Sequence, residues 1–288
     1  MPGRHDTESD VTEGIESRRG ENAAPSTASS FRLAVRRIAG EVNAGWRAFA
    51  RRRTAVFFTF FFPAILVVIF GALVRTDPTG DGLFAEPASY YVAGYVAVVV
   101  LFTPLSRLGS EVARHREGNR FERMATTPLG RGEWLIAQTI VNAVIIAIAV
   151  AGVLVLVVLL TDATVSLSPW LPVYVLVGVA CFCGVGAAIG SYTDSQDGAV
   201  AASNAIGLPL LFLSETFIAP DQMPSWLLPL LNLSPLTYFA RGVRAITDPG
   251  ATVEPVAGID PAVGNLAILL GFAVVAFWIG ARSIPTTE

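Results

Sequence analysis

Long apolar runs alternate with short polar segments along most of this chain. Six of these runs are almost free of charge and have the length of membrane-crossing helices, at about residues 55–74, 90–109, 134–160, 173–192, 199–217 and 262–281. A helix of about 20 apolar residues crosses the roughly 30 Å hydrocarbon core of a bilayer. The pattern therefore predicts an all-α fold, namely a polytopic membrane protein with six transmembrane helices.

The segment before the first run has a different periodicity. Its apolar residues recur every three or four positions, with arginines over much of the rest of the helix surface. The apolar positions are Phe31, Val35, Ile38, Val42, Trp46 and Phe49. We interpret this pattern as an N-terminal interfacial amphipathic helix in the headgroup plane, and a helix packed on a soluble partner is the alternative. Residues 1–30 are polar and are predicted to form a disordered cytoplasmic tail, with a short second tail at residues 283–288.

A charged segment, residues 111–133, separates the second run from the third. Charged side chains are costly in hydrocarbon, so this segment must lie outside the bilayer. Short loops rich in arginine stay on the cytoplasmic side, and three further arginines at residues 51–53 precede the first run. We therefore predict a multi-pass protein of the plasma membrane with both termini in the cytoplasm.

The segment after the fifth run, about residues 218–235, is too apolar for an aqueous loop and too rich in proline for a continuous helix. A broken, re-entrant helical segment in the outer leaflet would satisfy both properties, because irregular backbone at membrane depth is tolerated against protein or a cavity. Glu215 lies near the outer end of the fifth run, and we expect Arg241 or Arg244 to be its partner. The residues assigned to an outer vestibule are Glu215, Trp226, Asn232 and Arg241.

Composition supports the membrane class and narrows the chemistry. The 288 residues are 53% hydrophobic and 15% charged, with a mean hydropathy of +0.57. All 20 basic residues are arginine. A Walker A loop needs a lysine, so the chain is predicted to lack an ATP site and not to be an enzyme. Cys181 and Cys183 are expected to be small buried hydrophobes and His5 and His115 to be solvated. No catalytic residue, metal site or cofactor is predicted.

Two motifs resemble those of a known family. Residues 121–129 read FERMATTPL, and the later motif is split into FLS, QMPSWL and NLSPLTY at residues 212–214, 222–227 and 232–238. In this order, with six predicted spans and an amphipathic N-terminal helix, they are similar to the signatures of type-2 ABC transporter permeases. These are the membrane subunits of drug, polysaccharide and lipid exporters. The resemblance covers about residues 31–282, the predicted six-span permease domain.

The resemblance implies a role for the charged segment. Residues of about 111–127 are similar to the coupling helix that docks in a groove of the ATPase subunit. The residues assigned to this contact are Glu111, Arg114, Arg116, Glu117, Phe121, Glu122, Arg123 and Met124. Phe121 and Met124 are expected to form one apolar knob amid the charges. Residues 118–120 read GNR where the family often has Gly-Thr, so the docking register stays open.

The resemblance also implies partners. A separate ABC ATPase subunit would bind ATP and magnesium, and a second permease copy or a paralogue would complete the pathway within the lipid bilayer. No nucleic acid partner is expected. The predicted function is the permease subunit of an ABC transporter that exports a drug, lipid, glycan or other substrate.

Three other interpretations stay open on the sequence. The charged segment can be a merely solvated inner loop. An intramembrane enzyme would need a nucleophile with a base, but Ser191 and Ser214 have no obvious partner. An ion-coupled carrier without an ATPase usually places acidic groups at mid-membrane, and Glu215 is the only acid deep in an apolar run.

Overall fold

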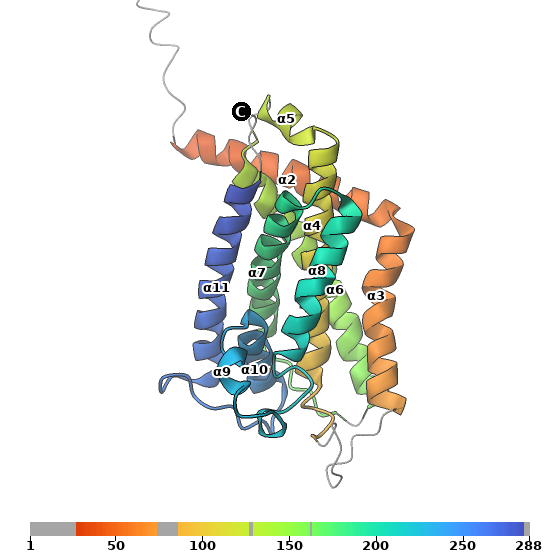
Figure 1. Ribbon diagram of the computed structural model, residues 1–288, viewed down its shortest axis with the longest axis vertical. Helices are drawn as coiled ribbons and strands as arrows, with labels where there is room; N and C mark the ends of the chain where they lie inside the picture. Colours follow the sequence, from red (N-terminus) through yellow and green to blue (C-terminus); the bar gives the residue numbers. More distant parts are fainter. Residues whose placement is uncertain (1–26, 74–85, 127–128, 162, 285–288) are drawn as a thin grey trace, which may run out of the picture.

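The computed structural model describes residues 27–73, 86–126, 129–161 and 163–284 (Figure 1). Regular structure in these ranges is helical, apart from one isolated bridge between Val256 and Ile259. The elements are α2 (Thr27–Arg51), α3 (Arg53–Val67), η1 (Val68–Leu73), α4 (Val92–Glu117), α5 (Arg120–Ala125), α6 (Arg131–Leu160), α7 (Leu171–Tyr192), α8 (Gln196–Phe212), η2 (Pro220–Gln222), α9 (Leu228–Leu231), α10 (Pro235–Thr247) and α11 (Pro261–Ser283).

Four of the described helices, α4, α6, α7 and α11, are long and apolar enough to cross a membrane. The count becomes five if the bent pair formed by α2 and α3 is one span, whose two parts meet at 93°. Helix α8 has 17 residues. The all-helical membrane fold is confirmed in this form, and six spans stay a prediction.

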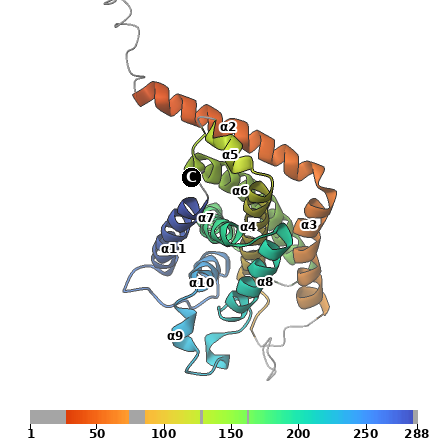
Figure 2. The ribbon, with the colours of Figure 1, turned by 45° about the horizontal axis from the view of Figure 1, so that its top comes forward.

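The helices form a bundle with two distinct ends. Helix α7 packs most extensively against α11 and α4, and α4 also packs against α8 (Figure 1). Helix α2 lies across one end, near α5 and the last described residues of the chain (Figure 2). We call this the α5 end. Helices α9 and α10 lie at the opposite end, which we call the α10 end (Figure 1).

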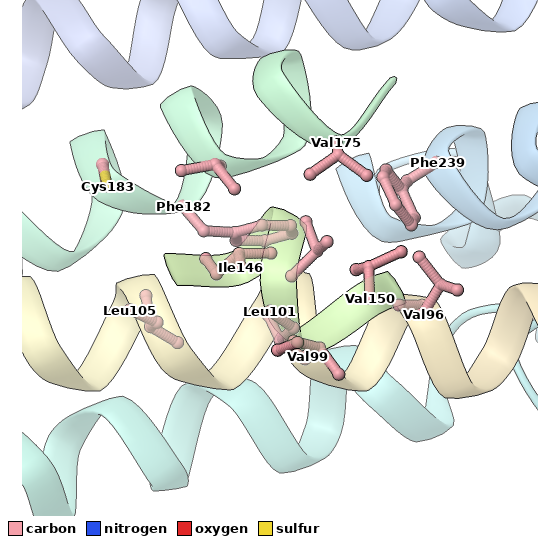
Figure 3. Close-up of a cluster of buried hydrophobic side chains, with 14 of the residues drawn as sticks. Val96, Val99, Leu101, Leu105, Ile146, Val150, Val175, Phe182, Cys183 and Phe239 are labelled. Carbon is pink, nitrogen blue, oxygen red and sulfur yellow. The ribbon is translucent and has the colours of Figure 1, made fainter. Parts of the chain in front are cut away.

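Close helix contacts depend on glycines of α7. A Cβ atom added at Gly186 would lie 2.6 Å from the carbonyl oxygen of Leu105 in α4, and Gly190 faces the same helix at Gly109. The backbones of α4 and α7 therefore approach as closely as small residues allow. Around this contact, Leu105, Ile146 and Phe182 lie in the apolar core that joins α4, α6 and α7 (Figure 3). Cys183 lies in the same core (Figure 3) and, like Cys181, is buried and free, as predicted.

Several element boundaries differ from the predictions. Helix α2 begins at Thr27, so the last residues of the predicted tail are helical, while residues 1–26 lie outside the described ranges. Helix α4 runs past the apolar limit to Glu117, and Asn119 then has a left-handed φ of 49° before α5 begins. The predicted coupling range, about 111–127, thus consists of the end of α4, a turn and α5, and its residue 127 is not described.

The proline-rich segment after α8 is broken. Helix α8 ends at Phe212, earlier than predicted, and the chain then forms only the 3-10 turn η2 and the four-residue helix α9 before α10. Prolines occupy early positions in each of these three elements, where a missing N–H donor costs least. The position of the segment relative to a bilayer stays a prediction.

Candidate functional site

Three regions carry polar chemistry against the apolar bundle: the α5 end, the α10 end, and a groove along α4. At the α5 end, the last two turns of α4 carry several charged residues close together. The Glu111 carboxylate forms an ion pair with Arg114, and its backbone carbonyl oxygen lies 2.8 Å from His115 Nδ1. Both contacts lie within one helix, so they hold these side chains against α4 itself.

Phe121 does not form the predicted knob. Its side chain is only 8% exposed, and its ring lies 5.5 Å from the ring of Trp134 and 5.3 Å from that of His115, measured between centroids. His115 is buried as well, so the expectation that it is solvated is wrong. The first turn of α6 supplies Trp134, which directly follows the charged segment in sequence, and this apolar contact draws both rings inward. Met124 lies in α5.

Two residues of the predicted coupling set connect α4 to the turn before α8. Arg116 donates a hydrogen bond of 2.8 Å to the carbonyl oxygen of Thr193. The Glu117 carboxylate accepts hydrogen bonds from the backbone and side chain of Gln196, at 3.0 and 3.2 Å. Displacement of the end of α4 would therefore be transmitted directly to the start of α8.

The remaining coupling candidates lie in α5. Glu122 is exposed, and Arg123 follows it in the same short helix. The structure thus turns Phe121 inward and leaves Glu122 available to a partner, and the predictions for the side chains of Arg123 and Met124 lie outside the described structure. Sequence reasoning missed the His115–Phe121–Trp134 cluster because nothing in the motif itself specifies the tryptophan.

Helix α2 is fixed to α6 by polar contacts. The Arg37 guanidinium forms a hydrogen-bonded ion pair of 2.6 Å with Glu133, and Gln138 donates a 3.2 Å hydrogen bond to Glu41. Gly45 then lies against Val141, with 3.1 Å between an added Cβ and the valine side chain. These contacts hold α2 across the α5 end, and its position at a membrane interface stays a prediction.

At the α10 end, three of the four predicted vestibule residues come together. Arg241 forms a two-point ion pair with Glu215, including a 2.9 Å bond from Nε, and also donates a 3.2 Å bond to the side chain of Asn232. This confirms the expected partner of Glu215, and the hydrogen bond to its carboxylate raises the pKa of the Arg241 guanidinium. Trp226 is 71% exposed and does not line the adjoining cavity of about 650 Å³.

Arg244 is the fourth member of this group, and we call Glu215, Asn232, Arg241 and Arg244 the α10-end cluster. The Arg244 side chain is 5% exposed, donates a 2.5 Å hydrogen bond to the backbone carbonyl of Glu215, and lies 3.6 Å from the centre of the Tyr90 ring. A cation in this position is stabilised by the aromatic face and by the carbonyl dipole. Arg241 and Arg244 therefore both find their partners within the chain.

The third region is a lateral groove of about 910 Å³ along α4, bounded by α2, α3 and α8. Most of its lining is apolar, including Phe62, Phe70, Phe102 and Phe217. Arg107 lies toward its α5 end and faces the Phe49 ring at 5.5 Å. The lone arginine within an apolar run was the available sequence signal, but the groove itself depends on how α3 and α8 diverge, which no local pattern specifies.

A comparison with models of known protein families identifies the family to which the chain belongs. The family model described as ABC-2 type transporter matches residues 41–247, which is more than half of the chain. The chain therefore belongs to the ABC-2 type transporter family, and it is a multi-pass membrane permease of an ABC transporter. A comparison with curated protein sequences found no match. Family membership implies an ABC ATPase partner.

Proposed function

We propose that this chain is the permease subunit of an ABC exporter, with six spans in the plasma membrane and both termini in the cytoplasm. In this arrangement the α5 end is cytoplasmic and the α10 end is external. Helices α3, with η1, and α8 supply the two spans beyond the four long apolar helices. The ATP and magnesium that drive transport bind to the separate ATPase subunit.

The observation that carries this proposal is the connection at the α5 end. Exposed charge on α5 can meet an ATPase surface, while Arg116 and Glu117 bind the turn that begins α8. Helix α8 lines the lateral groove. A push on α5 therefore has a short mechanical route to the wall of a cavity large enough for a drug-sized molecule.

The groove also supports a second permease copy. Helices α3 and α8 border it, and a lone groove of this kind would expose apolar side chains together with Arg107. We infer that a second copy or a paralogue faces this side, so that two grooves enclose one pathway. The proposed substrates accordingly enter from the cytoplasmic leaflet and leave at the α10 end.

The ion-coupled carrier receives less support. Glu215, the acid on which that interpretation depended, is 3% exposed and ion-paired with Arg241. A carboxylate held by an arginine is a poor site for reversible cation binding, because the bound guanidinium already supplies the counter-charge.

The decisive experiment is co-purification with a candidate ABC ATPase subunit, followed by ATP hydrolysis in reconstituted vesicles. We expect a stable complex whose hydrolysis depends on both subunits. Glu122→Arg should weaken the complex, more at low salt than at high salt because salt screens exposed charges. Arg47→Gln, on the exposed side of α2, is the matched control. A permease that transports without any ATPase would contradict the proposal.

A further inference from the structure

Arg107 differs from the other arginines that contact the bundle interior. Among the described residues, no carboxylate lies within ion-pair distance of its guanidinium and no hydrogen bond from it is found. Its one aromatic contact, with Phe49, is at 5.5 Å, near the outer limit for a cation–π interaction. Glu111 and Arg52 line the same part of the groove, but Glu111 is paired with Arg114, so the Arg107 guanidinium has no ion-pair partner of its own among the described residues.

The location of Arg107 in the groove is also informative. It lies ten residues before the end of α4 at Glu117, or about 15 Å along the helix at 1.5 Å per residue. Phe49, which it faces, belongs to α2, the helix that lies across the α5 end. The guanidinium is therefore near the level of the proposed headgroup plane, where a membrane-bound anion would carry its charge.

The remainder of the groove is suited to an apolar body. From Arg107 the lining continues along α4 to Val98, about 14 Å further from the α5 end. The aromatic rings of Phe70 and Phe217, 6.0 Å apart between centroids, lie in that direction. Side-chain hydroxyls of Thr103 and Ser106 add a few neutral polar groups near the arginine. The α5 end of the groove carries charged groups, two arginines (Arg52 and Arg107) and the Arg114-paired carboxylate of Glu111, and the other end is apolar.

We propose that the groove binds an amphipathic anion, with its acidic group at Arg107 and its hydrocarbon body along α4 between α3 and α8. This assigns a chemical class to the transported substrate and rests on the proposed function for the transport step. Charge complementarity decides the class: a neutral or cationic amphiphile would leave the arginine unpaired in an apolar cavity, which is costly. An acidic group would instead form charge-assisted hydrogen bonds.

The test uses the full chain, purified alone in a neutral detergent, with radiolabelled oleate and oleyl alcohol as probes that differ in their head group. We expect wild-type protein to bind oleate at least about tenfold more tightly than the alcohol. Arg107→Gln should abolish that preference, and Arg107→Lys should retain part of it. Arg47→Gln, an exposed arginine outside the groove, should leave both affinities unchanged.

Three results would overturn the inference. Equal binding of both probes by wild-type protein would show that the groove does not distinguish a charged from a neutral head group, whether or not any variant folds. A parallel loss of both probes in Arg107→Gln would mean that the side chain only shapes the cavity. Binding of neither probe, with cross-links across the groove between two copies, would identify the occupant as a second permease. The binding assay does not depend on the ATPase. If the chain fails to co-purify with an ATPase, the proposed function fails, but the preference for oleate can still be measured.

Discussion

Two regions of this permease place arginine side chains against apolar surfaces, and they do so differently. In the α10-end cluster, Arg241 and Arg244 use a carboxylate, an amide oxygen, a backbone carbonyl and an aromatic ring. In the groove, Arg107 has no ion pair or hydrogen bond from its guanidinium among the described residues, and it faces the Phe49 ring at 5.5 Å. Both regions contain a cavity, at about 650 and 910 Å³. The two regions therefore differ more in the partners of their arginines than in the volume of their cavities.

The contrast separates two roles of arginine: one stabilises the fold, and the other binds a ligand. A buried cation with all its partners inside the chain holds α10 to the start of α4 and to the segment after α8, and its removal leaves those partners unsatisfied. A cation without partners contributes little to the fold and keeps its binding capacity for a ligand. Substituting glutamine at each arginine should therefore affect stability at one site and binding at the other.

The largest effect is expected for Arg244→Gln. The substitution removes a charge-assisted hydrogen bond to the carbonyl of Glu215 and the contact with the Tyr90 ring, and the shorter amide cannot replace both. We expect a loss of about 4 kcal/mol in the free energy of unfolding. Titration of the purified protein with a denaturing detergent would measure it. A loss below about 1 kcal/mol would contradict the structural role assigned to Arg244.

Phe121→Ala extends the same distinction to the α5 end. Because the ring packs on His115 and Trp134, its removal should leave a cavity and cost about 3 kcal/mol of stability. Glu122→Ala, the exposed neighbour, is the control and should cost almost nothing. Intact stability in Phe121→Ala, with weaker ATPase association, would instead restore the predicted outward knob.

A smaller effect is expected for Glu215→Gln, which keeps the shape of the side chain and removes its charge. Arg241 would retain its bond to Asn232 and a weaker one to the new amide, and it is partly exposed to water. We expect a loss of about 2 kcal/mol. In the double variant with Arg241→Gln the two losses should be less than additive, because one ion pair is counted in both. Additive losses would show that the pair is not coupled.

The apolar pattern predicts the long helices well and their polar ends poorly. The third predicted span, 134–160, differs from α6 only in its first turn, and the last, 262–281, nearly equals α11. The second span ends in the prediction at residue 109, whereas α4 continues to Glu117. Hydropathy marks where side chains become polar, and a helix continues through that point when its backbone hydrogen bonds are uninterrupted.

The candidate sites were also predictable only where their contacts have a local signal in the sequence. The pairing of Glu215 was predictable, because two arginines lie close together in α10, but the choice between them was not. Arg241 took the carboxylate and Arg244 the backbone carbonyl. Burial of Phe121 depends on a residue of another helix, and the groove depends on the separation of α3 and α8. Contacts of this kind require the packed bundle and have no local signature.

The smallest stability effect is expected where the fold alone would suggest a large one. Arg107→Gln replaces a cation near the end of an apolar run, yet the side chain has no ion pair or hydrogen bond among the described residues and faces the groove. Loss of a weak contact with Phe49 should change the free energy of unfolding by less than about 0.5 kcal/mol. The measurement is the same detergent titration used for Arg244→Gln, without added ligand. With saturating oleate, wild-type protein should gain stability by mass action and Arg107→Gln should gain far less. A loss comparable to that of Arg244→Gln in ligand-free protein would place Arg107 with the structural arginines and end the distinction between the two regions.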